Sequence, residues 1–345
     1  MIYHKNNKQY KYRTKKHYLC GMEKIKKYKE QFDLFMDMVD FNRQPEGLYE
    51  PVAYTVLQSG KRLRPMLCLL ACDLFDGDFN EAKYPALALE TAHNFTLIHD
   101  DIMDQAPIRR GKETVYKKWN TNQAILSGDA ALVMAYEFAM RTHSNPLEVV
   151  RLLNQVLLEV CEGQQMDMEF ESRNEVTITE YLEMIRLKTA VLLATSLKIG
   201  AVVAGADEED QRHVYDFGIA LGMSFQLQDD ILDCYSDVAV FGKMTGGDIM
   251  ENKKTLMYLK ALELASSEQR NRLTALFTGE VSVNPQRKID EVIGIYDDLH
   301  VREEVEKLMA DYDCQAQAAL DAVKLPEERK TRLRLYADLL SGRNK

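Results

Sequence analysis

Apolar residues recur at three- and four-residue spacing from residue 48 to the end of the chain, and stretches of alternating β-branched residues are nearly absent. This period is typical of helices with one buried face, so the sequence predicts an all-α fold. Asn284, whose side chain can accept a hydrogen bond from the turn that follows, is expected to be an N-cap. The expected helices are Leu48–Ser59, Leu63–Leu74, Tyr84–Gln105, Gln123–Arg141, Pro146–Gln165, Ile178–Val203, Glu208–Tyr235, Thr255–Ala265, Ser267–Leu276, Pro285–Tyr296, Val301–Val323 and Glu327–Leu340.

No Ser/Gly-rich linker divides these helices, which favours one all-α catalytic domain over residues 31–345. Residues 1–30 differ, because ten Lys and Arg residues gather there with little aliphatic content. We expect a mobile basic arm, in which Met22 is an alternative to Met1 as the start of the chain. A solvated arm is favoured over one that touches anionic lipid, and we expect no transmembrane segment.

Composition narrows the class of protein. The 345 residues are 46% hydrophobic, which is ample for a buried core. The formal net charge of -10 argues against a nucleic-acid partner. The six cysteines include no CxxC pair, so we expect reduced thiols and a cytoplasmic protein.

An acidic pattern occurs twice, at Asp100–Asp104 and at Asp229–Asp233, and each copy follows a long apolar run. On a helix, the first and fifth positions lie about 40° apart, so each copy would present two carboxylates on one face. Such carboxylates repel one another, but their oxygens suit a hard cation such as Mg²⁺. Two facing clusters could hold several Mg²⁺ ions around a polyphosphate.

The first copy is flanked by a histidine and by an arginine pair. His93 lies nearly two helical turns before Asp100 and therefore on the same face. Arg109 and Arg110 follow in a loop that contains a proline and a glycine. Guanidinium groups and carboxylate-held Mg²⁺ are complementary ways to bind one diphosphate. A solvated acidic turn beside an ordinary basic loop is the alternative.

The second copy ends a helix in which Gly218 and Gly222 lie on nearly the same face as Asp229. Their missing side chains leave space. That space could serve close helix packing or could admit an apolar substrate tail, and the sequence leaves both possibilities open. Because close carboxylates destabilise a helix end, cation binding explains the acidic cluster better than stability does.

These motifs together resemble those of the trans-type polyprenyl diphosphate synthases, and the resemblance covers the chain from about Leu48 to its end. The first acidic copy, with its histidine and arginines, is similar to the family's first aspartate block. The further matching motifs are Gly60–Pro65 (GKxxRP), Lys188–Thr189 (KT), Phe225–Asp233 (FQxxDDxxD), and Lys243, Gly247–Asp248 and Lys253–Thr255 in a lysine-bearing tail. Asn252 departs from the pattern, since many members have glycine at that position.

The resemblance implies a single-domain isoprenoid synthase fold, with helices around a deep central cavity and the two acidic motifs facing each other across its mouth. It implies Mg²⁺ at about three ions per site, for which Mn²⁺ could substitute. The implied metal residues are Asp100, Asp101, Asp104, Asp229, Asp230 and Asp233. The residues implied for the allylic diphosphate are Arg109, Lys188, Lys243 and Lys253. The residues implied for isopentenyl diphosphate are Gly60, Lys61, Arg64, His93 and Arg110.

The implied reaction is head-to-tail prenyl transfer by ionisation, condensation and elimination. The allylic carbon–oxygen bond breaks, the double bond of isopentenyl diphosphate attacks the cation, and a proton is lost. The resemblance implies as catalytic residues Lys188, Thr189, Gln226, Asp100, Asp104 and Asp229. Water would trap the cation, so the glycine-rich residues 242–252 are expected to be a closing loop.

Product length is expected to depend on Phe95, which lies five residues before Asp100 and about 7.5 Å deeper along the helix. In the family, an aromatic residue at that position goes with short products. With Phe95 large and Thr96 small, we expect Phe95 to be the floor of the cavity and the product to be farnesyl or geranylgeranyl diphosphate. Plain core packing of Phe95 is the alternative.

Two other functions would fit part of the pattern. A class I terpene cyclase shares an aspartate motif and a helical cavity, but it needs no second diphosphate site such as Lys61, Arg64 and His93 suggest. A noncatalytic subunit of a heteromeric prenyl synthase would be expected to have lost an aspartate motif, whereas both are intact. The resemblance further implies a homodimer, for which Gln123–Arg141 could supply the interface.

Overall fold

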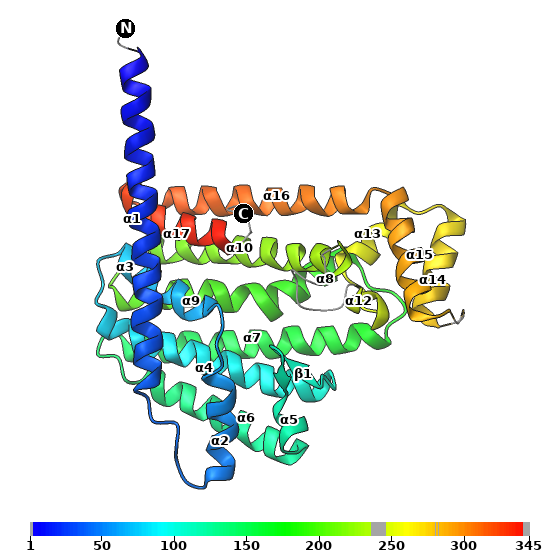
Figure 1. The fold of residues 1–345 in the computed structure, drawn as a ribbon, viewed down its shortest axis with the longest axis horizontal. Helices are drawn as coiled ribbons and strands as arrows, with labels where there is room; N and C mark the ends of the chain where they lie inside the picture. Colours follow the sequence, from blue (N-terminus) through cyan, green and yellow to red (C-terminus); the bar gives the residue numbers. More distant parts are fainter. Residues whose placement is uncertain (1–2, 236–245, 280, 282, 341–345) are drawn as a thin grey trace.

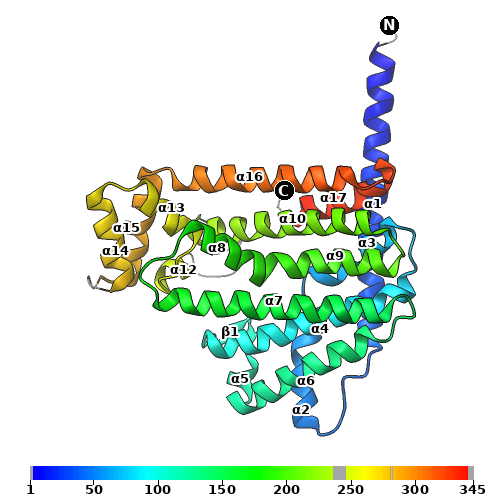
Figure 2. The same ribbon diagram turned by 180° about the vertical axis from the view of Figure 1, so that it is seen from behind.

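The computed structural model describes residues 3–235, 246–279, 281 and 283–340, with side chains from Cys20 onward. Long helices run roughly side by side in stacked layers, and α1 crosses one end of the stack (Figures 1 and 2). A short antiparallel hairpin pairs β1 (Ile108–Arg109) with β2 (Lys112–Glu113). The helices are α1 (Tyr3–Asp37), α2 (Glu46–Val56), α3 (Leu63–Leu74), α4 (Phe79–Met103), α5 (Val115–Lys118), α6 (Thr121–Ala139), α7 (Pro146–Ser172), α8 (Ile178–Ile185), the π-helix η1 (Arg186–Ala190), α9 (Val191–Val203), α10 (Glu208–Tyr235), α12 (Gly247–Met250), α13 (Leu256–Leu264), α14 (Ser267–Thr278), α15 (Pro285–Asp298), α16 (Val301–Ala322) and α17 (Glu327–Leu340).

The predicted all-α, single-domain architecture is confirmed, and most helices begin and end within a few residues of their expected positions. Asn284 is the N-cap of α15, where its side chain accepts a hydrogen bond from the Arg287 backbone. The segment Ile178–Val203 was expected to be one continuous helix, and this was wrong. It is interrupted by the π-helix η1, in which an extra residue widens one turn.

The centre of the bundle is formed by α9, which is apolar on nearly every side and is therefore buried all round. Helix α3 packs tightly against it. A Cβ atom at Gly200 would lie 2.1 Å from the carbonyl oxygen of Cys68, so glycine is required for this approach of the two backbones. The remaining helices surround α9, and among them both α4 and α10 contact it.

The first and last helices meet on α3, where Asp73 joins them. Asp73 accepts hydrogen bonds from Lys24 at 2.6 Å and from Tyr28 at 2.8 Å, both on α1. On the other side, the Nε atom of Arg332 in α17 lies 2.6 Å from the same carboxylate. Residues 3–30 of the predicted basic arm thus belong to α1; the division at residue 30 and the mobility of the arm stay predictions.

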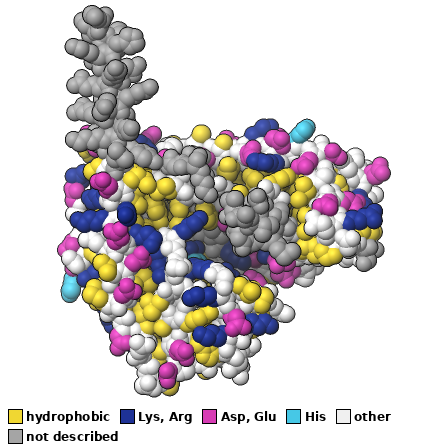
Figure 3. Space-filling view, viewed as in Figure 1, with side chains coloured by type: hydrophobic (Ala, Val, Ile, Leu, Met, Phe, Trp, Pro, Cys, Tyr) yellow, Lys and Arg dark blue, Asp and Glu magenta, His cyan; other side chains and the backbone are white. Residues whose placement is uncertain are grey.

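The acidic ends of α4 and α10 lie on the same side of the stack, away from α1 (Figure 1). Between the part that contains α2, α5 and α6 and the part that contains α10 and α16, the surface is hollowed, and Lys and Arg side chains gather around the hollow (Figure 3). Within the described part of the chain, no helix is long and apolar enough to cross a membrane.

Candidate active site

The first acidic motif forms the C-terminal end of α4. Asp100 and Asp101 lie in its last turn, and Asp104 is the C-cap residue, fully at the surface. Burial raises the pKa of Asp100 to about 6, while the ammonium of Lys188 opposes this rise. Keeping several carboxylates charged and partly buried at this end of α4 costs free energy, and a bound cation would remove that cost.

Arg109 and Arg110 lie on the β1–β2 hairpin that follows α4. The Nε atom of Arg109 donates a hydrogen bond to Asp101 at 2.6 Å, which holds the hairpin against the helix end. Arg110 and Gly111 both have left-handed backbones, with φ of 52° and 74°, as a two-residue hairpin turn requires. The expected loop is therefore an ordered hairpin that presents two guanidinium groups beside the acidic helix end.

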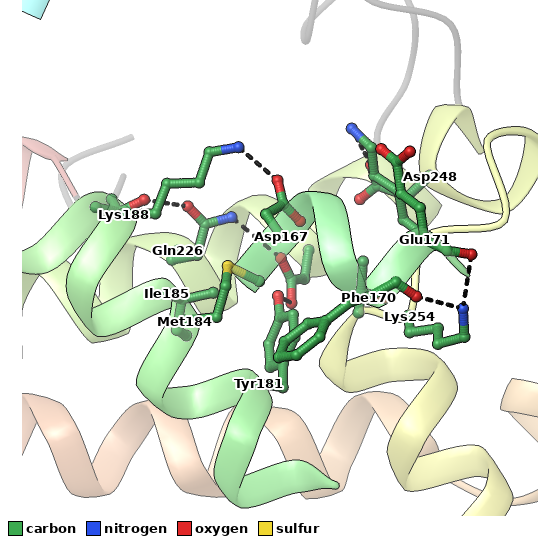
Figure 4. Close-up of a pocket in the computed structure, with 14 residues that line it drawn as sticks. Asp167, Phe170, Glu171, Tyr181, Met184, Ile185, Lys188, Gln226, Asp248 and Lys254 are labelled. Carbon is green, nitrogen blue, oxygen red and sulfur yellow. Dashed lines mark hydrogen bonds and ion pairs between the residues drawn. The ribbon is translucent and has the colours of Figure 1, made fainter. Parts of the chain in front are cut away.

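The π-helix η1 carries Lys188 and Thr189 into the same region. The Nζ atom of Lys188 lies 2.5 Å from Oδ2 of Asp167 on α7 (Figure 4). A Cβ atom at Gly163 would lie 2.4 Å from the backbone nitrogen of Lys188, so α7 and η1 are in direct backbone contact. Single widened turns of this kind occur often at functional sites, because they redirect side chains without ending the helix.

The second acidic motif ends α10, and its middle carboxylate points inward. Asp230 accepts hydrogen bonds from the Tyr181 hydroxyl at 2.5 Å, the Gln226 amide at 3.3 Å and the Leu256 backbone at 3.4 Å. Burial raises the pKa of Asp230 to about 7, and the hydrogen bond from Tyr181 opposes this rise. Asp230 therefore connects α10 to α8 and α13.

The other two aspartates of this motif lie to either side of Asp230. Asp229 is half-buried at the end of α10. Asp233 is buried, and its Oδ2 accepts a hydrogen bond from the backbone of Asp248 at 3.1 Å. This bond attaches the short helix α12 to the acidic end of α10.

Between η1, α7, α10 and the segment after α12 lies a cavity of about 140 Å³. It brings together five of the predicted residues, namely Lys188, Thr189, Gln226, Asp230 and Lys253. Thr189 donates a hydrogen bond to Oε1 of Gln226 at 3.1 Å, and the Gln226 amide then reaches Asp230. Figure 4 shows Lys188, Asp167 and Gln226 pointing toward one another on one side of this cavity.

The residues expected to bind isopentenyl diphosphate form a second group behind the hairpin. Burial and then the charges of Arg64, Arg110 and Arg109 lower the pKa of His93 well below its ordinary value, so this imidazole is neutral. A Cβ atom at Gly60 would lie 3.5 Å from Nη1 of Arg110. The described structure thus gathers Gly60, Arg64, His93 and Arg110, while Lys61 is exposed in the same loop.

The lysine-bearing tail falls partly beyond the described residues. Lys243, and with it residues 242–245 of the expected closing loop, lie outside them, as do the terminal residues 341–345. Lys253 lines the cavity and forms an ion pair with Glu251 at 2.9 Å. Asn252 has a left-handed backbone with φ of 58°, a conformation that glycine adopts freely and that asparagine also tolerates.

Three predictions about packing can be compared with the structure. Cβ atoms at Gly218 and Gly222 would lie 2.4 Å and 2.5 Å from Cα atoms of α9 and η1, so these glycines serve close helix packing. Phe95 is buried, with its ring edge-on to His99 at 5.0 Å between centroids. Thr96 donates its hydroxyl hydrogen to the carbonyl oxygen of His93 at 2.8 Å. Their roles in product length stay predictions.

A divalent cation fits the donor set of the two acidic ends, because carboxylate oxygens are the ligands that Mg²⁺ prefers. Among the residues that the structure describes, no three His, Cys, Asp or Glu side chains are gathered tightly enough to hold a metal ion by themselves. The fit therefore rests on the chemistry of the carboxylates and on the raised pKa of Asp100, which marks a carboxylate that a cation would stabilise.

Several further residues of the site belong to none of the sequence motifs. Asp167 pairs with Lys188, Tyr181 donates to Asp230, and Gly163 allows the contact between α7 and η1. Arg62 and Glu90 form a buried ion pair behind the arginines. The signal available for Glu90 was a single charge within the apolar run Ala86–Ala92.

Comparison with known proteins agrees with this geometry. The sequence model of the polyprenyl synthetase family matches residues 45–295. A short chain isoprenyl diphosphate synthase from Methanothermobacter thermautotrophicus is 35% identical over 324 residues, covering 93% of this chain and 98% of that protein. A geranylgeranyl pyrophosphate synthase from Geoglobus acetivorans is 44% identical over 224 residues, covering 64% of this chain and 70% of that protein. A crystal structure of a geranylgeranyl pyrophosphate synthase superposes with a TM-score of 0.87 at 39% identity, covering 92% of this chain and 98% of that one.

Proposed function

Since the chain belongs to the polyprenyl synthetase family and is a trans-prenyltransferase, we propose that its cavity condenses isopentenyl diphosphate with dimethylallyl, geranyl or farnesyl diphosphate. The product would be farnesyl or geranylgeranyl diphosphate. One observation carries the proposal: two separate groups of cations border the same acidic helix end. The charge of Lys188 acts on Asp100, and the charges of Arg64 and Arg110 act on His93. Two diphosphate substrates need two such subsites.

The family uses a divalent metal ion, and here we propose Mg²⁺, at about three ions per site, with Mn²⁺ as a substitute. Asp100, Asp104 and Asp229 would hold it, with the neighbouring aspartates close to the ions or bonded through water. When bound there, Mg²⁺ would neutralise the charge that develops on the departing diphosphate.

The chain's own residues would bind the substrates and shield the cation. Lys188 would leave Asp167 or share its hydrogen bonds to contact the allylic diphosphate, together with Arg109 and Lys253. Thr189 donates its hydrogen to Gln226, so the lone pairs of its oxygen are available to face the allylic cation. No side-chain nucleophile is needed, and an oxygen of the departing diphosphate is the proposed base.

The test is an incubation of purified protein with Mg²⁺, radiolabelled isopentenyl diphosphate and each of the three allylic diphosphates, followed by sizing of the products. Asp100→Ala and Asp229→Ala are expected to lower kcat by about 10²-fold or more, as the loss of a transition-state contact does. Asp311→Ala, an exposed aspartate on α16, is the matched control and should leave kcat unchanged. Failure to elongate any allylic substrate would defeat the proposal, and diphosphate release without isopentenyl diphosphate would indicate a cyclase.

We further propose a homodimer built on α6 and α7, in the cytoplasm. Leu126, Val133 and Met140 recur at seven-residue spacing along and just beyond α6, and each is at least 60% exposed. Leu147 and Leu158 of α7 continue the exposed apolar surface. An exposed stripe of large apolar residues is typical of a surface that another subunit covers.

A further inference from the structure

Behind the arginines proposed to bind isopentenyl diphosphate lies a buried ion pair between Arg62 and Glu90. The Nη1 atom of Arg62 lies 2.7 Å from Oε1 of Glu90, and the two side chains are 5% and 4% exposed. The same Nη1 donates to the carbonyl oxygen of Val56 at 2.9 Å. A pair so far from water is held in one geometry, because breaking it would leave a buried charge without a partner.

The backbone fixes both members of the pair. Arg62 is the N-cap residue of α3 and has a left-handed backbone, with φ of 52°. This conformation is unfavourable for a residue with a side chain and persists where its surroundings hold it. Glu90 lies in the middle of α4, between apolar residues that are fully buried. Neither position is explained by packing alone, since an apolar residue would fill each site at a lower cost in desolvation.

The charge of Glu90 also reaches the guanidinium groups on the substrate side. Burial lowers the pKa of Arg64 to about 10, and the charge of Glu90 opposes this fall more than any other group. Burial likewise lowers the pKa of Arg110, again opposed first by Glu90. Asp33 of α1 is more distant, with its carboxylate 3.8 Å from Nε of Arg62 and partly exposed to solvent. The carboxylate of Glu90 thus pairs directly with Arg62, and its charge acts at longer range on Arg64 and Arg110.

We propose that Glu90 and Arg62 are a positioning pair that holds the guanidinium groups of Arg64 and Arg110 in place for the diphosphate of isopentenyl diphosphate. The inference rests on the proposed function. Arg62 would contact no substrate; it holds the carboxylate of Glu90 in place through the hydrogen bond from its Nη1 atom. Three guanidinium groups and one carboxylate leave a net positive charge, which the negative charge of an incoming diphosphate would neutralise. Without Glu90, the three cations would repel one another and spread apart.

The decisive variant is Glu90→Gln, which keeps the shape of the side chain and removes its charge. The KM for isopentenyl diphosphate is expected to rise by about tenfold or more, as when one partner of a buried charged pair is removed. The KM for the allylic substrate and kcat at saturating isopentenyl diphosphate should change less than about twofold. Glu90→Asp, which keeps the charge, should recover part of the affinity.

Glu137→Gln is the matched control, because it removes the carboxylate of other ion pairs, whose partners Arg43 and Arg141 are not residues of the site. It should leave both KM values unchanged. Calorimetric titration of Glu90→Gln with isopentenyl diphosphate alone gives a readout that needs no turnover, and weaker binding than wild type is expected. If Glu90→Gln does not fold, Arg62→Lys decides the matter, since lysine keeps the charge but replaces the planar guanidinium that bonds to Glu90 and to the carbonyl oxygen of Val56. It is expected to raise the KM for isopentenyl diphosphate and to leave the KM for the allylic substrate unchanged.

Equal rises in both KM values, or lower thermal stability with unchanged KM values, would overturn the inference and leave the pair a structural one. The two proposals fail differently. A wild-type protein that transfers no prenyl group would defeat the proposed function, whereas an active wild type whose Glu90→Gln variant binds isopentenyl diphosphate normally would defeat the positioning pair.

Discussion

Gly163 of α7 lies directly against the backbone of Lys188 in the π-helix, where an added methyl group would come within 2.4 Å of the Lys188 nitrogen. Gly163→Ala is therefore expected to displace η1, lower kcat and destabilise the fold by about 1–3 kcal/mol. The measurement is kcat together with thermal unfolding. Gly294→Ala is the matched control, because nothing lies within 4 Å of the added methyl group in α15. Wild-type kcat in Gly163→Ala would show that the contact does not position Lys188.

The pKa of Asp100, raised to about 6 by burial, predicts an acid limb in the pH profile. As the pH falls through this value, a proton competes with the metal for the carboxylate, so kcat/KM should fall. Higher Mg²⁺ should shift the limb to lower pH, because both cations bind the same oxygens. Profiles between about pH 5 and pH 8 at two Mg²⁺ concentrations test this. An acid limb whose pH does not change with the Mg²⁺ concentration would contradict competition between proton and metal at Asp100.

The raised pKa of Asp100 also makes the stability of the metal-free protein depend on pH. The folded-state pKa of Asp100 lies above its unfolded value of 3.8, so the folded state binds the proton more tightly. Its contribution to stability is full below about pH 4 and is lost as the pH rises through about 6. Unfolding measured in the presence of a chelator should show this contribution in the wild type and not in Asp100→Asn.

Phe95→Ala is expected to lengthen the product, because removing the ring would open space below Asp100 along α4. Sizing of the radiolabelled products measures the change. The substitution of a buried phenylalanine costs about 3–5 kcal/mol, so an equally buried ring elsewhere is the control. Phe277→Ala, in the second core cluster, should destabilise the protein without changing product length. An unchanged product in a folded Phe95→Ala variant would leave Phe95 with a packing role.

Val133→Glu is expected to weaken self-association by at least about tenfold, equivalent to about 1.4 kcal/mol, because it places a charge in the exposed apolar stripe of α6. Sedimentation velocity over a concentration series measures it. Met38→Glu alters a similarly exposed apolar residue in the turn after α1 and should leave association unchanged. Identical sedimentation of wild type and Val133→Glu would argue against a subunit contact through α6.

The helices could be predicted from the sequence because one buried face imposes a regular period. Leu63–Leu74 and Glu208–Tyr235 have the expected bounds. The π-turn at Arg186–Ala190 could not be predicted, since it leaves the apolar pattern on both sides intact. It depends on how closely α7 can approach, and this depends on Gly163. Helix α7 also outlasts its expected end at Gln165, because Lys254 donates to the carbonyl oxygens of Phe170 and Glu171 in its last turn.

Site residues that are close together in the sequence could be predicted. Site residues that come together only in the folded chain could not. The aspartate motifs and the arginine pair are visible as local sequence patterns. Asp167 is one of several acidic residues in the second half of α7, whereas Glu90 is a single charge in a largely apolar part of α4. The partners of both lie elsewhere in the chain. A sequence alone does not show which distant cation such a carboxylate will meet. Similarly, the sequence around Gly218 and Gly222 is compatible with close helix packing and with space for a substrate tail. The closeness of α9 and η1 to these glycines shows that they serve packing.

The junction at Asp73 couples the two ends of the chain, and this affects how the protein can be made. Lys24 and Tyr28 on α1 are synthesised first, whereas Arg332 on α17 is synthesised last. Because folding proceeds during synthesis from the N-terminus, α1 can pack early against α3 and α4 but gains its contacts with α17 only when nearly the whole chain exists. Until then the side of α1 that packs on α17 is exposed to chaperones and to aggregation.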